Sequence, residues 1–125
     1  MTSAVQEPVR TWLRFEGLAA LVLSTYLYAT QGGSWFLFGA LFLVPDISFA
    51  GYLAGPRIGA MIYNLAHSYV GPLTLAGAHF VSGMPGLLLA MVWGAHIGFD
   101  RTLGYGLKYS TAFGDTHLGR IGRAA

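Results

Sequence analysis

Residues 34–53 read SWFLFGALFLVPDISFAGYL, an apolar run long enough to cross a bilayer as a helix at ~1.5 Å per residue. Its single charged residue, Asp46, directly follows Pro45. Proline cannot donate a hydrogen bond to the carbonyl of Leu41, and it disfavours helical geometry at Val44. We therefore predict a helix that breaks here, with Asp46 in the first turn of its second half. A carboxylate at this depth is costly and needs a partner.

The whole composition is that of a membrane protein. The 125 residues are 54% hydrophobic and 10% charged, and they include no cysteine. A soluble domain of this length could not hide so many unbroken apolar stretches around one core. The absence of cysteine excludes disulfides and thiolate metal sites.

Outward from the first run, three further apolar stretches are separated by short Gly/Pro-rich connectors. The predicted spans are Trp12–Thr30, Ser34–Ala54, Gly59–Phe80 and Gly86–Phe99. Short connectors make consecutive helices antiparallel neighbours. We predict an all-α integral membrane four-helix bundle with antiparallel up-down topology. Residues 1–11 are then a cytoplasmic N-terminus, residues 12–100 the transmembrane domain and residues 101–125 a cytoplasmic Gly-rich tail.

The basic residues give the orientation of this bundle. If the N-terminus is cytoplasmic, all seven fall on the inner side of the membrane, as the positive-inside rule requires. The protein is thus predicted to be a multi-pass protein of the cytoplasmic membrane with both termini inside. Because the seven are scattered and form no basic run, nucleic acid is not a predicted partner. They are Arg10, Arg14, Arg57, Arg101, Lys108, Arg120 and Arg123.

Glycines recur every four residues in two places. Gly51, Gly55 and Gly59 flank the second connector, and Gly94 and Gly98 lie in the last span. Small faces let helices approach closely, so we expect helix contacts here and a homo-oligomer, most simply a dimer, through a glycine face.

The tail after the last span has little apolar periodicity. Tyr105, Lys108, Asp115 and His117 could fold under the bundle as a lid, but the pattern favours a solvated tail.

Ionisable residues in the inner half of the membrane form the candidate site. His96 and Asp100 are four residues apart and share a helix face, as do Tyr63 and His67, with Asn64 beside them. Buried ionisable groups normally face the bundle interior and pair with one another or mark a functional site.

The first span adds a carboxylate. Arg14 and Glu16 are two residues apart on nearly opposite sides of a helix. We expect Arg14 to reach the lipid head groups and Glu16 to turn inward.

These histidines and carboxylates are the ligand types of zinc, manganese and non-haem iron. The predicted metal ligands are Asp46, His67, His96 and Asp100, and the predicted catalytic residues are Glu16, Asp100 and Arg101. A divalent ion would activate water, or support oxidation, against a membrane-soluble substrate. No HExxH motif is present, so two alternatives stay open. One is a proton-coupled binding or transport module, acting as an oligomer. The other is a structural subunit, in which Arg101 neutralises Asp100 and the polar groups are fully paired without a cavity.

Three segments resemble a known family: LFLVPDISFAGYLAGPRIGAMIYNLAHSY (residues 41–69), WGAHIGFDRTLGYGLKY (residues 93–109) and DTHLG (residues 115–119). With RFEGL near the start, they are similar to the DUF4260 family of small bacterial membrane proteins, which is defined by sequence and has no assigned activity. The matching positions are Glu16, Asp46, Asn64, His67, His96, Asp100, Arg101, Lys108 and His117. A looser likeness, by analogy only, is to membrane-bound metal-dependent hydrolases.

Overall fold

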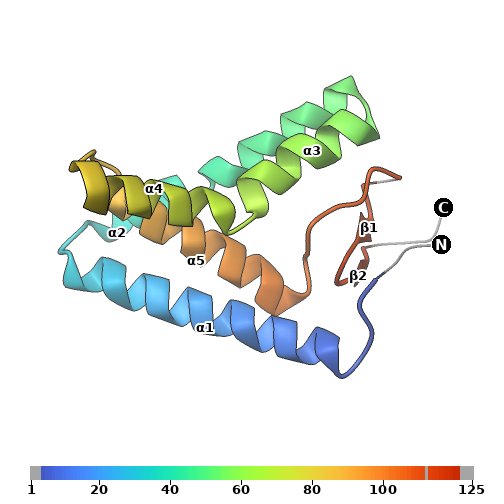
Figure 1. Ribbon diagram of the computed structural model, residues 1–125, viewed down its shortest axis with the longest axis horizontal. Coiled ribbons are helices and arrows are strands. Elements are labelled where there is room, and N and C mark those ends of the chain that lie inside the picture. The colour runs from blue at the N-terminus through green and yellow to red at the C-terminus, as the bar shows by residue number, and fades with distance from the viewer. Residues whose placement is uncertain (1–3, 112, 122–125) are drawn as a thin grey trace.

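The computed structural model describes residues 4–111 and 113–121. The chain is all-α, with a small hairpin at its end (Figure 1). Its elements are α1 (Val9–Thr30), α2 (Trp35–Phe42), the 3₁₀ helix η1 (Val44–Ala54), α3 (Pro56–His67), α4 (Val70–Ser82), α5 (Leu87–Leu103), β1 (Asp115–Thr116) and β2 (Gly119–Arg120). The helices run back and forth along the molecule, so that the start of α1, the η1–α3 turn and the β1–β2 hairpin lie toward one end.

Helix α5 lies at the centre of the molecule. It contacts α1, α2 and α4, and seven of its residues are buried. Its closest approach is to α1, where an added Cβ on Gly98 would lie 2.6 Å from the carbonyl oxygen of Gly17. The reverse also holds, since a Cβ on Gly17 would lie 2.4 Å from the Cβ of Arg101. Glycine therefore sets the separation of α1 and α5.

The glycine faces predicted from the sequence do make helix contacts, and they make them inside one chain. Gly51 and Gly59 face Ile62 and Tyr52 across the η1–α3 hairpin. Gly55 instead forms the turn, with φ of 105°. Gly94 and Gly98 face α1. Because the helix-facing glycines are covered within the chain, a homo-oligomer stays a prediction that would need another surface.

The predicted break at Pro45 is confirmed. Helix α2 ends at Phe42, and the chain continues as the 3₁₀ helix η1, with Asp46 in its first turn. The N–H of Asp46 donates to the carbonyl of Leu43 at 3.2 Å, not to that of Phe42 four residues back. The carbonyl of Phe42 is therefore left for another donor.

The third predicted span, Gly59–Phe80, is wrong as a single helix. It is two helices, α3 and α4, separated at Ser68, whose backbone is extended with φ −99° and ψ 144°. The physical reason is Pro72, which cannot donate to the carbonyl of Ser68 and whose ring would clash with it in a continuous helix. Two donors on α5 satisfy carbonyls at the end of α3: the Trp93 indole donates to Ala66 at 2.6 Å, and Arg101 donates to His67 at 2.8 Å.

The prediction of a solvated tail is also wrong. The side chain of Asn64 holds the backbone of Lys108 from both sides, donating to its carbonyl at 2.8 Å and accepting from its N–H at 2.7 Å. Leu118 and Thr116 are fully buried, and the N–H of Val5 donates to the carbonyl of His117 at 2.8 Å. These buried contacts stabilise the tail against the helices, although its sequence is rich in glycine and has little apolar periodicity.

The outside of the molecule is strongly apolar. Phe36, Leu53 and Val81 are 89–93% exposed, and other large apolar side chains on every helix are also exposed. Among the residues that the structure describes, Trp35–Ala54 (α2 with η1) is the one helical segment long and apolar enough to cross a membrane, with mean hydropathy of 1.7. Helices α3 and α4 have 12 and 13 residues, because Ser68 divides the stretch that the sequence presented as one span.

Candidate metal centre

Four side chains from three elements meet at one point. The Nε2 atom of His67 lies 3.3 Å from a carboxylate oxygen of Asp46 and 3.6 Å from one of Asp100. The Nε2 atom of His96 lies 3.3 Å from the same two oxygens. The two Nε2 atoms are 3.2 Å apart, and all four ligand atoms lie within 4.8 Å of one another. The structure thus brings together the four predicted metal ligands.

Backbone carbonyls fix the orientation of both imidazoles. Nδ1 of His67 is 3.0 Å from the carbonyl oxygen of Tyr63, and Nδ1 of His96 is 2.6 Å from that of Phe42. A carbonyl only accepts, so each Nδ1 is the donor, and in the neutral ring each Nε2 carries a lone pair and no proton. This is the second contact that metal-ligating histidines usually make.

The spacing of the donor atoms fits a small divalent ion. Ligands about 2.0–2.1 Å from a tetrahedral ion lie about 3.3–3.4 Å from one another. Five of the six distances in the cluster are 3.2–3.6 Å. The remaining distance, between the Asp46 and Asp100 oxygens, is within 4.8 Å.

Local sequence explains how each ligand reaches this point. Asp46 projects from the first turn of η1 because Pro45 ends α2. His67 is the last residue of α3, where the break before α4 places it beside α5. His96 and Asp100 are one helical turn apart on buried α5. Asp46 does not cap its half-helix, since η1 has no side-chain cap hydrogen bond.

The cluster has a buried side and an open side. The side chains of His67 and His96 are 3% exposed, whereas those of Asp100 and Asp46 are 16% and 41% exposed. Both carboxylates line a cavity of about 240 Å³. Its lining residues are Asp46, Phe49, Tyr63, Asp100, Tyr105, Lys108, Phe113 and Ile121. The histidines therefore lie on the buried side of the cluster, and the carboxylates lie on the side that opens to the cavity.

Three of the other predicted polar residues support this cavity. The ring of Tyr63 stacks on His67, with 3.8 Å between centroids and 7° between planes. Asn64 fixes the tail by its two bonds to Lys108. Lys108 is buried, and its ammonium donates to the carbonyl of Phe113 at 2.7 Å. Burial lowers the pKa of Lys108, and the negative charge of Asp100 offsets part of that shift.

His117 lies in the tail, outside the four-residue cluster. Its Nδ1 accepts from the N–H of Leu107 at 2.9 Å. Burial lowers the pKa of its imidazole, and the positive charge of Arg101 lowers it further. His117 therefore holds the tail in place, and it is not one of the described residues that line the cavity.

Arg101 and Glu16 do not lie where the sequence suggested. The guanidinium of Arg101 donates to the carbonyl of His67 and lies 5.4 Å from the ring of Tyr69, and no ion pair with Asp100 occurs among residues 4–111 and 113–121. Glu16 is exposed and outside the cluster, because its neighbour Gly17 is the residue that faces α5. Arg14, expected at the lipid head groups, instead donates to the carbonyl of Thr102 at 2.9 Å.

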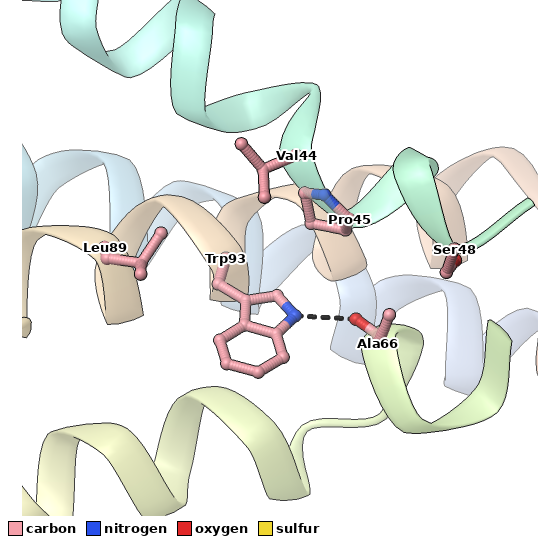
Figure 2. A pocket seen from close by; sticks show the side chains of 6 residues that line it. All are labelled: Val44, Pro45, Ser48, Ala66, Leu89 and Trp93. Carbon is pink, nitrogen blue, oxygen red and sulfur yellow. Dashed lines mark hydrogen bonds between the residues drawn. The ribbon is translucent and has the colours of Figure 1, made fainter. Parts of the chain in front are cut away.

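Trp93 also stabilises the site, although the sequence did not predict this role. Figure 2 shows its indole bonded to the Ala66 carbonyl, beside an apolar pocket of about 190 Å³ that Pro45 and Leu89 also line. Trp93 lies three residues before His96, so helix spacing was the available signal. The aromatic cavity wall, with Phe113 from the tail, carried no such signal because it depends on how the tail folds.

The sequence model described as "Domain of unknown function (DUF4260)" matches residues 10–121. The chain belongs to this family, as its motifs suggested. No curated protein and no solved structure matches it.

Proposed function

We propose that this DUF4260 protein is an integral membrane metalloenzyme whose centre is formed by Asp46, His67, His96 and Asp100. The observation that carries the proposal is the meeting of four ligand atoms within 4.8 Å: two carboxylate oxygens and two Nε2 atoms, each of which is unprotonated when its ring is neutral. With both rings neutral, the four atoms are all acceptors and cannot hydrogen-bond to one another, and the two buried Nε2 atoms would lack a donor, which is costly. A divalent cation satisfies all four at once.

The cavity favours an enzyme over a structural subunit. A purely structural network would be fully paired and closed, whereas Asp46 and Asp100 line an open space of about 240 Å³. Pairing by protons alone would need a proton on both rings, which would place two positively charged imidazoles with their Nε2 atoms 3.2 Å apart. The proton-coupled alternative is thus the weaker explanation of this geometry.

The reaction that these residues support best is hydrolysis. A divalent ion supplies a water of lowered pKa at neutral pH. Asp46, the more exposed of the two carboxylates, would accept a proton as general base through its second oxygen. If the resident metal proves to be iron, the same ligands would instead support oxidation, because two histidines and a carboxylate are an iron-binding set.

A membrane location would favour a substrate carried by the bilayer. We propose four spans, formed by α1, α2 with η1, α3 with α4, and α5, with both termini in the cytoplasm. Two features support this topology. The basic residues all fall on one side of the membrane in this orientation, and the exterior of the molecule is apolar. The metal centre then opens toward the inner leaflet.

The test is elemental analysis of the full chain purified in neutral detergent without added metal. We expect about one divalent ion per chain, and its loss in His67→Ala and His96→Ala. His79→Ala is the matched control, because His79 lies on α4 and bonds to the carbonyl of Met84 in the α4–α5 turn, away from the cluster. A parent protein that holds no metal and takes up none on titration with zinc, manganese or iron would contradict the proposal.

A further inference from the structure

Lys108 is the one cationic side chain among the described residues that line the cavity beside the metal ligands. It comes from the tail, and the two Asn64 bonds to its backbone fix its position. Its ammonium lies 3.7 Å from the ring centroid of Phe113 and 4.8 Å from that of Tyr63. A buried ammonium in the wall of a cavity is a costly arrangement that needs a reason.

The known contacts of Lys108 use only part of its bonding capacity. An ammonium has three donors, and the carbonyl of Phe113 accepts from one of them. The two aromatic rings contribute cation–π attraction, which does not replace a hydrogen-bond acceptor. Within residues 4–111 and 113–121, the Phe113 carbonyl is the one hydrogen-bond acceptor of this ammonium, which leaves donors for a molecule in the cavity.

The charges that face the cavity define what that molecule is. Asp46 and Asp100 contribute two negative charges and Lys108 one positive charge. With a divalent ion on the two carboxylates, the ion, the carboxylates and Lys108 together carry one net positive charge. In a half-buried site that charge favours an anion, because attraction is stronger where water is excluded.

The remaining wall of the cavity is apolar and aromatic. Phe49, Tyr63, Tyr105 and Phe113 line it together with Ile121. Such a surface suits a hydrocarbon chain attached to the charged group.

From this placement, and resting on the metal centre proposed above, we infer that the cavity binds an oxyanion, such as a phosphate or carboxylate group, between the metal and Lys108. The substrate is accordingly an anionic compound, and the aromatic wall receives its apolar portion. Lys108 acts as the residue that selects charge, and Asp46 and Asp100 hold the ion that the oxyanion meets.

The test uses the full chain loaded with Co²⁺ in neutral detergent, because the visible absorption of Co²⁺ reports changes at its ligands. Three probes are titrated: inorganic phosphate, dodecyl phosphate and uncharged dodecanol. We expect both phosphates to change the spectrum and dodecanol to leave it unchanged. Tighter binding of dodecyl phosphate identifies a lipid-borne source, and equal binding identifies a soluble one. A dodecanol response equal to that of the phosphates would overturn the inference without any variant.

Variants then test the role of Lys108. Lys108→Met should weaken phosphate binding about tenfold or more, the effect of losing one bond to a charged group. Lys108→Arg should retain most of the affinity. Arg57→Met is the matched control, since it removes the same charge from an exposed residue at the start of α3. Equal losses in Lys108→Met and Arg57→Met would show a non-specific charge effect and overturn the inference.

The two proposals fail in different ways. A chain that takes up no metal contradicts the metalloenzyme and the oxyanion site together. A chain that binds Co²⁺ stoichiometrically, yet shows no response to either phosphate, contradicts only the oxyanion site.

Discussion

The α1–α5 pair and the η1–α3 pair are both packed through glycine, yet they serve different purposes. Helices α1 and α5 are continuous over 22 and 17 residues. The η1–α3 pair lies between two backbone breaks, at Leu43 and Ser68. Each of these breaks frees carbonyls, and those carbonyls hold His96, Trp93 and Arg101. Continuous helices supply the scaffold, and interrupted ones supply the polar backbone groups from which a site can be built.

The largest effect is expected where the continuous pair is forced apart. Gly98→Ala should destabilise the protein by about 3 kcal/mol, because the new Cβ meets the backbone of α1, at Gly17 and Leu21, at 2.6 Å. Thermal unfolding in detergent measures the change. Gly77→Ala is the matched control, since nothing lies within 4 Å of its Cβ, and it should stabilise α4 by about 0.5–1 kcal/mol. Equal shifts of the two variants would contradict a glycine-dependent contact.

A smaller effect should follow from removing the first break. In Pro45→Ala, the N–H of Asp46 can return to the Phe42 carbonyl, which then competes with His96 for it. We expect metal affinity to fall about 10- to 100-fold, as for other lost partners of ligating histidines, while stability is maintained. Competition with a chelator measures the affinity. Pro85→Ala, in the α4–α5 turn, is the control. Unchanged metal affinity in Pro45→Ala would show that the metal site does not depend on the helix break at Pro45.

The smallest effect concerns the tail that covers the η1–α3 pair. The pKa of His117 is lowered in the folded state, so its contribution to stability is complete above about pH 6.5 and is lost as the pH falls through the folded-state pKa. Protonation removes the acceptor for the Leu107 N–H, a loss of about 1 kcal/mol. Hydrogen exchange at Leu107 should therefore quicken in acid, after correction for intrinsic rates. His117→Asn keeps an acceptor that does not titrate, and a persisting pH dependence in it would point to another group.

Part of this structure could be predicted from the sequence. Asp46, His67, His96 and Asp100 stand out because charge in an apolar run is expensive, and the helical spacing of the last two puts them on one face. The break at Pro45 follows from its missing N–H. Each of these features depends on residues that are close together in the sequence.

Other features depend on contacts between distant segments. Pro72 indicates a break in the third predicted span, but Trp93 and Arg101, which stabilise this break, come from another helix. The orientation of Glu16 depends on the contact of Gly17 with α5. The tail is held by Asn64, 44 residues before the Lys108 that it binds. No pattern within the tail itself could reveal that attachment.

The 3₁₀ form of η1 also changes how far the chain reaches. Eleven residues rise about 22 Å at 2.0 Å each, against about 16 Å for an α-helix of the same length. The segment Val44–Ala54 is therefore about 5 Å longer than an α-helix of the same residue count. This extra length carries the η1–α3 turn further from α2. Asp46 and Phe49, which both line the cavity, are correspondingly further apart along η1 than they would be on an α-helix, so the cavity wall that they form is longer.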